Sequence, residues 1–348
     1  MNIRDIKTYA AYLLLLGVLY ALTSCQRKND PVPKPVQQRP IELSAATEWP
    51  DSKGIIDNVT DLAGDGIVVW AAWSQDLGGG ITKNDSNVFG ENGTKVYFPN
   101  WTYRPTCYWT ASTYNFAAAL PASVFNATHG HDGNPETDRL VTGTFDGNDL
   151  SLIFDNFNLS GSQTDLIYTF QTVDNTGSQN PIVSLNFQER LCTQLRIEMT
   201  SEIADDKTFS VNEVSVYGLH KSLDGEIHID SEGLKEEYLR IRLSDRSDYD
   251  SPYTIVTKPA EADWTISSGR TTELINELIV FPEAFSETSP IYIKIVYDDN
   301  HELIYTLNNG EWEAGRIYTY LLKPESITIG DPVVKPWGTI KLPEFEIK

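Results

Sequence analysis

The chain has 348 residues, enough for two domains of ordinary size, with 49 acidic side chains against 27 basic ones. A net charge of −22 repels nucleic acid and anionic lipid head groups, so nucleic acid is excluded as a partner. Aromatic residues make up 11% of the chain, which excludes a disordered acidic tail.

The N-terminus carries the pattern of an export signal that ends at a lipidation site. Arg4 and Lys7 precede an almost wholly apolar run that ends at Leu22. This run is about 14 residues long, whereas a membrane-spanning helix takes roughly 20. Thr-Ser-Cys then follows, so we expect residues 1–24 to be removed and Cys25 to carry palmitate-type acyl chains. Acylated Cys25 would anchor the protein to the outer membrane, whereas an ordinary signal peptide with an incidental cysteine is the alternative.

Residues 25–40 have the composition of an extended tether. Four prolines alternate here with lysine and glutamine, and no apolar periodicity is present. Polyproline geometry rises about 3.1 Å per residue, so the tether would hold the fold roughly 40 Å from the membrane.

After the tether, the signals are short strands bounded by turn residues. Strand-like runs occupy residues 41–45, 67–70, 96–98, 150–154, 291–295, 303–307, 317–322 and 327–329. Helical patterning is weak, with one turn expected at residues 274–278. The pattern predicts an all-β sandwich. A polar break near residue 178 predicts two consecutive domains, at 41–178 and 179–337.

The clearest alternation lies between residues 183 and 199. The positions predicted to be buried are Val183, Leu185, Phe187, Leu191, Leu195, Ile197 and Met199, and those predicted to face solvent are Ser184, Asn186, Gln188, Arg190, Gln194, Arg196 and Glu198. Glu189 and Thr193 interrupt the apolar face, which predicts a bulge or break near them.

Two cysteines remain after Cys25. Cys107 and Cys192 would be exported to a compartment that permits a disulfide. We expect them unpaired, because Cys192 lies on the polar register of its strand and in the other predicted domain. Three cysteines cannot form a paired-cysteine metal site.

Candidate metal sites are weak in this sequence. His129 and His131 lie near Glu136 and Asp138, a set that can bind zinc, but a solvent-exposed loop is the preferred interpretation. Residues 146–149 resemble the start of a calcium loop, but Leu150 stands where a ligand is needed and Ser151 where glycine is needed. The acidic residues Asp245, Asp248 and Asp250 are interpreted as a solvated turn. We expect no metal and no cofactor.

The sequence offers no catalytic motif, since a nucleophile elbow, a P-loop and a zinc-protease helix are all missing from it. A cluster of aromatic residues is compatible with a sugar-stacking platform, although burial in a sandwich core is the preferred interpretation. Its members are Trp101, Tyr103, Tyr108, Trp109, Tyr114 and Phe116. A surface glycan-binding lipoprotein of a nutrient-uptake system is therefore the alternative function.

Several segments together resemble the fimbrillin-like lipoproteins of Bacteroidia, which build type V pili. The segments are residues 41–45, the turn at 64–67, Tyr108-Trp109 with 114–121, 185–187, and 312–320 closing on Pro336-Trp337. The resemblance implies two transthyretin-like β-sandwich domains and a non-enzymatic role in a fimbria and in cell adhesion, with host or bacterial surface ligands as further partners.

In such pili, the resemblance implies, subunits join by donor-strand exchange. A protease removes an N-terminal strand, and a C-terminal strand of the next subunit fills the groove by β-augmentation. Here the exchangeable strand would carry Ile41, Leu43 and Ala45, and the donor strand, in the tail 338–348, would carry Ile340, Leu342, Phe345 and Ile347. The alternative is that the tail is an ordinary last strand of its own domain.

Maturation in such relatives occurs at an arginine. Arg27 and Arg39 precede the first strand, and Pro40 after Arg39 resists most proteases. The next arginine is Arg104. A first strand that is retained would suit the membrane-anchor subunit of a fimbria.

Overall fold

The computed structural model describes residues 39–44, 66–78, 80–97, 102–110, 113–125, 141–175, 183–187, 189–202, 208–234, 240–298, 300–324, 332–336 and 340–341. The predicted lipidation site Cys25, the tether before Arg39, the histidine loop at 129–131 and the break at 176–182 lie outside these residues.

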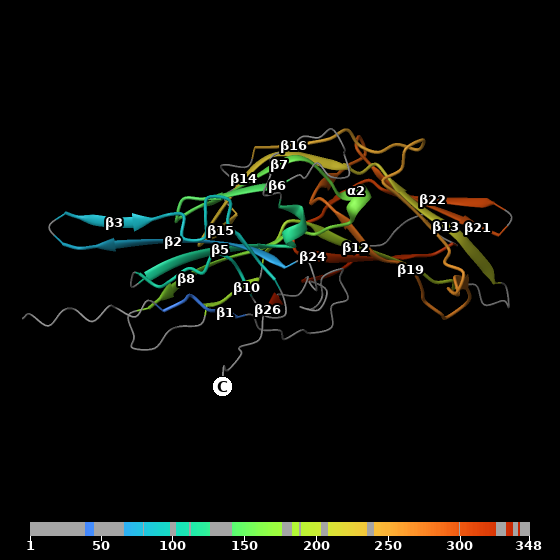
Figure 1. Ribbon diagram of the computed structural model, residues 1–348. Coiled ribbons are helices and arrows are strands. Elements are labelled where there is room, and N and C mark those ends of the chain that lie inside the picture. Colours follow the sequence, from blue (N-terminus) through green and yellow to red (C-terminus); the bar gives the residue numbers. More distant parts are fainter. Residues whose placement is uncertain are drawn as a thin grey trace, which may run out of the picture. The chain divides into compact units, whose positions relative to one another are not determined.

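The described chain is built almost wholly of β-strands, which confirms the all-β sandwich prediction (Figure 1). The first large sheet has the order β11-β8-β5-β2-β3, with β4 also on β2: β11 Glu189–Arg190, β8 Ile167–Asp174, β5 Thr113–Leu120, β2 Ile67–Asp76, β3 Thr82–Asp85 and β4 Thr94–Val96. The second has the order β15-β14-β7-β6, with β16 on β14: β15 Gly233–Leu234, β14 Ser222–Asp230, β7 Leu150–Asn158, β6 Val141–Phe145 and β16 Arg240–Leu243.

Two further large sheets come mainly from the C-terminal half. One has the order β19-β12-β24-β25: β19 Thr272–Val280, β12 Thr193–Met199, β24 Arg316–Leu322 and β25 Val333–Pro336. The other has the order β17-β13-β21-β22, with β18 on β13: β17 Thr254–Thr257, β13 Phe209–Tyr217, β21 Ile291–Tyr297, β22 His301–Leu307 and β18 Thr265–Ile266.

Shorter elements complete the described structure. Two-stranded pairings join β1 Leu43–Ser44 to β9 Val183–Ser184, β10 Asn186–Phe187 to β26 Ile340–Lys341, and β20 Ala284–Phe285 to β23 Gly310–Glu311. Helical structure in the described residues is confined to the 3₁₀ turn Ala122–Val124 and α2 Leu159–Ser162.

Strand β2 shows why the first sheet needs cover on both faces. Its run is apolar at successive positions rather than alternate ones, which is typical of a strand buried on both sides. Val68 and Trp70 pack into the cluster shared with β6, β7 and β14. Ile67 and Val69 point the other way, into a second cluster that includes Ile41 near the N-terminus. The second face is therefore covered by short segments rather than by another large sheet.

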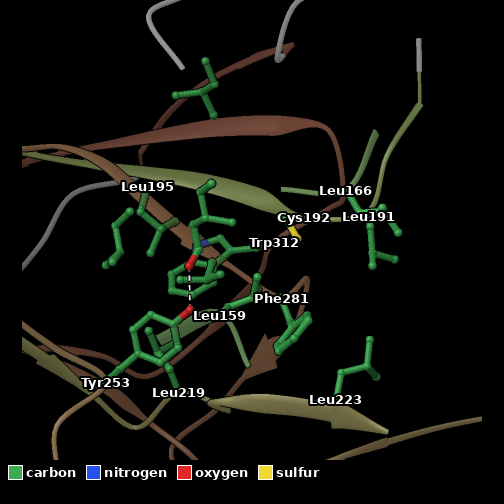
Figure 2. Close-up of a cluster of buried hydrophobic side chains, with 14 of the residues drawn as sticks. Leu159, Leu166, Leu191, Cys192, Leu195, Leu219, Leu223, Tyr253, Phe281 and Trp312 are labelled. Carbon is green, nitrogen blue, oxygen red and sulfur yellow. Dashed lines mark hydrogen bonds between the residues drawn. The ribbon is translucent and has the colours of Figure 1, made fainter. Parts of the chain in front are cut away.

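Sheet pairing crosses the sequence position at which we predict the domain boundary. Strand β14 pairs along β7, although the two strands lie on opposite sides of residue 178. Its neighbour in sequence, β13, belongs to a different sheet. Figure 2 shows buried side chains from both sides of this position in one cluster, among them Leu159, Leu166 and Trp312. The two-domain division stays a prediction, with strands shared across it.

The predicted strand over residues 183–199 is divided into β9, β10, β11 and β12. The break expected near Glu189 and Thr193 is present. The solvent-facing prediction is wrong for Arg190 and Gln194, which are 3% and 0% exposed. Arg190 is buried because it pairs with the buried carboxylate of Asp165 at 2.7 Å.

Two further expectations need correction. Residues 274–278 belong to strand β19 and form no helical turn, because β12 supplies the hydrogen bonds of a sheet there. Cys192 is fully buried rather than on a solvent-facing register. Cys107 and Cys192 are both free thiols, as expected. Solvent exposure of Cys192 is not the reason, because this side chain is buried.

Candidate functional site

Segments from near both ends of the described chain pair with one stretch, residues 183–187. Near the N-terminus, β1 runs parallel to β9, with Leu43 opposite Val183. Near the C-terminus, β26 runs antiparallel to β10, with Ile340 opposite Phe187. Figure 1 shows β1, β10 and β26 together beside β8. We call residues 183–187 the acceptor segment.

Residues 40–44, here called the N-terminal segment, are bonded on two sides. On one side the Val183 amide donates to the Glu42 carbonyl at 3.0 Å, and β1 pairs with β9. On the other side the Ile41 amide donates to the Cys107 carbonyl at 2.9 Å. The Tyr103 hydroxyl donates to the Ile41 carbonyl at 2.6 Å. The segment therefore completes a layer between the acceptor segment and the loop around Cys107.

The N-terminal segment buries two of the three residues predicted for the exchangeable strand. Ile41 is 1% exposed and Leu43 is 8% exposed, while Ala45 lies outside the described residues. Both side chains join the apolar cluster that contains Phe187. Full burial of an Ile or Leu side chain contributes about 1.5–3 kcal/mol, so losing the segment would uncover an apolar groove.

The described part of the predicted donor tail is short. Ile340 and Lys341 form β26 on the acceptor segment of their own chain. Leu342, Phe345 and Ile347 lie outside the described residues. The same stretch of backbone therefore pairs with both segments that the sequence marks for strand exchange.

The candidate arginine cleavage points are exposed but poorly suited to release the segment. Arg39 is exposed and precedes the segment, so a cut there would leave residues 40–44 in place. Arg104 is exposed in the loop that bonds the segment. Each of these arginines is followed by proline.

The aromatic cluster turns inward, as the preferred interpretation expected. Trp109 is 8% exposed, and Tyr114 and Phe116 are fully buried. Trp109 meets Tyr114 edge to face with ring centroids 4.8 Å apart, a favourable aromatic geometry. Tyr108 is 39% exposed, and Trp101 lies outside the described residues. These buried rings build the core beneath the N-terminal segment and leave no flat aromatic surface between them for a sugar.

The described residues give no support to the candidate metal sites of the sequence. Among its residues, no group of three or more His, Cys, Asp or Glu side chains is arranged to hold a metal ion. In the acidic loop, Asp248 Oδ1 accepts the Ser251 amide at 2.8 Å, as in a solvated turn. The described part of the chain also contains no helix with the length and apolar character needed to span a membrane.

Sequence reasoning missed the roles of Tyr103 and Cys107 beside the N-terminal segment. The sequence pattern identifies Tyr103 only as one aromatic residue among several, and Cys107 only as a candidate disulfide partner. The aromatic density of residues 101–116 was the available signal, and it marks a core without telling which loop faces which strand.

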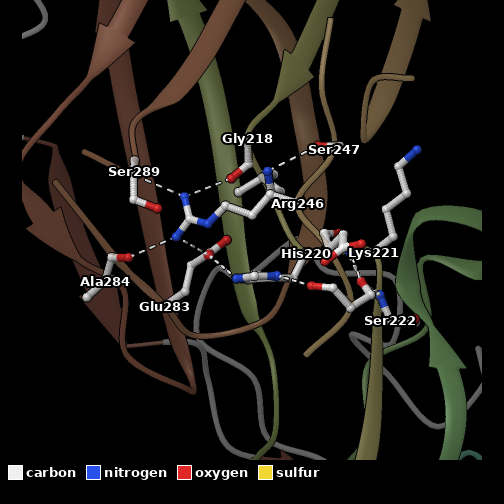
Figure 3. A network of polar contacts seen from close by, with 12 residues as sticks. Gly218, His220, Lys221, Ser222, Arg246, Ser247, Glu283, Ala284 and Ser289 are labelled. Atoms are coloured by element: carbon white, nitrogen blue, oxygen red, sulfur yellow. Dashed lines mark hydrogen bonds and ion pairs between the residues drawn. The ribbon is translucent and has the colours of Figure 1, made fainter. Parts of the chain in front are cut away.

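A polar network at Arg246 joins three loops (Figure 3). Arg246 donates to the Gly218 carbonyl at 2.9 Å, to the Ser289 carbonyl at 3.0 Å and to Glu283 Oε2 at 2.9 Å. His220 Nε2 lies 3.5 Å from the same carboxylate. Burial raises the pKa of Glu283 to about 7, with Arg246 acting in the opposite direction. Burial lowers the pKa of His220.

The Glu283 carboxyl predicts a pH-dependent contribution to stability. Its pKa is higher in the folded chain, so between pH 4.5 and pH 7 the folded state binds more protons than the unfolded state. Its contribution to the unfolding free energy therefore falls as pH rises through this window and levels off above it. Urea unfolding of the wild type and of Glu283→Gln at pH 5, 6, 7 and 8 measures this difference.

Glu283→Gln keeps an acceptor for Arg246 and removes the titration, so the advantage of the wild type over this variant should shrink as pH rises. His220 titrates with the opposite sign, losing stability as pH falls below 6.5, and is present in both proteins. A constant difference between the two proteins across the range would refute the assignment.

The family model for fimbrillin-like proteins matches residues 59–337, far more than half of the chain. The chain therefore belongs to the fimbrillin-like family, which confirms the resemblance found in the sequence. Family membership makes it a pilus or adhesin subunit of the cell surface, which associates with other fimbrial subunits. The family is structural and not enzymatic.

Solved structures with a similar fold have low sequence identity to this chain. A candidate cell adhesion protein from Bacteroides uniformis is 16% identical, over 88% of this chain and 100% of its own, with a TM-score of 0.45. A fimbrial protein from Bacteroides vulgatus is 15% identical, over 86% of this chain and 100% of its own, with a TM-score of 0.47. No curated protein matches the sequence.

Proposed function

We propose that this protein is a lipid-anchored subunit of a fimbria that joins its neighbours by strand exchange. The observation that supports this proposal is the shared use of residues 183–187 by β1 and β26. A short stretch that pairs with two peripheral segments is suited to exchange one of them for a strand from another subunit. Backbone hydrogen bonds supply affinity in such an exchange, and pockets for alternate side chains set the register.

We further propose that it serves as the membrane-anchor subunit, with acylated Cys25 in the outer membrane. The exposed Arg39 lies on the N-terminal side of the segment, and Pro40 follows it. An arginine-specific protease should therefore leave residues 40–44 on the fold. In such a subunit the groove under β1 stays filled by its own segment unless that segment is displaced, while its own tail remains available to a neighbour. The fibre would then be held to the cell through the tether.

Strand donation is tested by removing the tail and returning it as a peptide. The variant lacking residues 338–348 should stay folded and should bind a labelled peptide of that sequence, because the backbone of β10 is then unpaired on that side. A scrambled peptide of the same composition is the control, and fluorescence anisotropy measures the binding. If the truncated chain unfolds, the tail completes its own domain and donation is wrong.

The anchor role is tested with an arginine-specific protease on the purified chain. Mass spectrometry should find residues 40–44 still attached to the fold after digestion, with no polymers formed by the digested protein. Release of this segment with polymer growth would show a stalk subunit instead. The glycan-binding alternative loses its main support, because Trp109, Tyr114 and Phe116 are buried.

A further inference from the structure

The loop of residues 103–107, here called the clasp loop, meets both backbone groups of Ile41. The Tyr103 hydroxyl donates to the Ile41 carbonyl at 2.6 Å, and the Ile41 amide donates to the Cys107 carbonyl at 2.9 Å. Ile41 is 1% exposed, so water is largely excluded from these groups. A buried backbone group without a partner is costly, which makes the clasp loop essential to this position of the segment.

The clasp loop is fixed to the sheet independently of the N-terminal segment. The Cys107 thiol donates to the Val88 carbonyl at 3.0 Å, and the Val88 amide donates to Ala71 of β2 at 3.1 Å. The Tyr103 ring packs on Phe89 with centroids 5.0 Å apart. These contacts do not involve Ile41, so the loop has its own support if the segment departs.

The Tyr103 hydroxyl has a second acceptor within reach. It lies 3.5 Å from the Cys107 carbonyl, the same oxygen that accepts the Ile41 amide. Burial raises the pKa of Tyr103 to about 12, so the hydroxyl keeps its proton at physiological pH. When Ile41 leaves, the Tyr103 hydroxyl and the Cys107 carbonyl both lose a partner, and each becomes available to the other.

We infer that Tyr103 is a latch: its hydroxyl holds the N-terminal segment through the Ile41 carbonyl and moves to the Cys107 carbonyl when the segment is displaced. This inference rests on the proposed strand exchange and names the residue that controls it. The latch contacts backbone rather than side chain. It therefore accepts any entering strand that presents a carbonyl in the register of Ile41. In the vacated groove it leaves neither the Tyr103 hydroxyl nor the Cys107 carbonyl unsatisfied.

The test is hydrogen exchange of the intact monomer, comparing Tyr103→Phe with the wild type. Phenylalanine keeps the ring that packs on Phe89 and removes only the hydroxyl. The Ile41 amide donates to Cys107 and the Val183 amide donates to Glu42, so both report on whether the segment is in place. Both amides should exchange about five-fold faster in the variant, as expected for the loss of one hydrogen bond. Tyr97→Phe is the matched control, because Tyr97 is 46% exposed and adjoins the same region.

Amides of β12, residues 193–199, report on the fold as a whole and should be unchanged in both variants. Unchanged exchange at Ile41 and Val183 in Tyr103→Phe would overturn the latch. Faster exchange throughout, β12 included, would also overturn it, since Tyr103 would then be a general core residue. This measurement needs no polymer and is independent of the peptide-binding test. Amide exchange can therefore contradict the latch while the tail peptide binds, or support the latch while the tail peptide does not bind.

Discussion

Replacing Arg190 with methionine should lower the free energy of unfolding by about 3–5 kcal/mol. Arg190 Nη1 lies 2.7 Å from Asp165 Oδ2, and the two side chains are only 1% and 2% exposed. Burial raises the pKa of Asp165, and the guanidinium of Arg190 counters that shift. Without it, the carboxylate must stay buried unpaired or take up a proton. Urea unfolding followed by circular dichroism at pH 7 measures the loss.

The surface pair Arg270–Asp263 is the matched control. Its two atoms are 2.6 Å apart, closer than in the buried pair, but the side chains are 51% and 57% exposed. Arg270→Met should cost much less than Arg190→Met, because exposed ion pairs contribute little. The double variant Asp165→Asn/Arg190→Met should regain part of the loss. Equal losses for Arg190→Met and Arg270→Met would contradict the role given to burial.

Replacing Trp312 with alanine should destabilise the fold by about 3–5 kcal/mol. Trp312 is 1% exposed and packs on Phe285 with ring centroids 5.1 Å apart. Its indole Nε1 donates to the Tyr320 hydroxyl at 2.8 Å. The alanine variant loses the packing, leaves a cavity and removes the indole N–H that donates to Tyr320. Guanidinium unfolding followed by circular dichroism measures the effect.

Trp312→Phe separates packing from hydrogen bonding. This variant keeps most of the ring volume and loses the indole N–H, so its loss should be clearly smaller than that of the alanine variant. Tyr249→Ala is the surface reference, because Tyr249 is 53% exposed. A loss for Trp312→Ala no larger than for Tyr249→Ala would show that Trp312 does not hold this part of the core.

The local pattern of apolar residues was enough to locate the strand-like runs that begin at Ile41 and at Ile67. The alternation of Ile41 with Leu43 predicted a strand with one buried face, and both residues are buried. The run that begins at Ile67 predicted a strand, and it forms the start of β2, where successive side chains are buried. These predictions succeed because side chains of a strand alternate between two faces whatever the partner is.

Strands β11 and β12, which follow the acceptor segment, show the limit of that reasoning. Alternation alone assigned Arg190 and Gln194 to solvent, because a polar side chain on the polar register is normally exposed. Burial of Arg190 depends on Asp165, which lies 25 positions earlier in the chain. A one-dimensional pattern does not show a charge partner that a distant segment brings close, here the segment between α2 and β8.

The sequence by itself determined the all-β class, the fimbrillin-like resemblance and the strand-like run that begins at Ile41. The class and the strand-like run follow from local periodicity and from residue types whose burial is favourable in any sandwich. The resemblance follows from the order and spacing of several segments. Only the tertiary structure decided that β1 and β26 share residues 183–187 and that Tyr103 bonds Ile41. Such pairings join residues from 62 to more than 100 positions apart, and backbone hydrogen bonds between them leave no mark in side-chain periodicity.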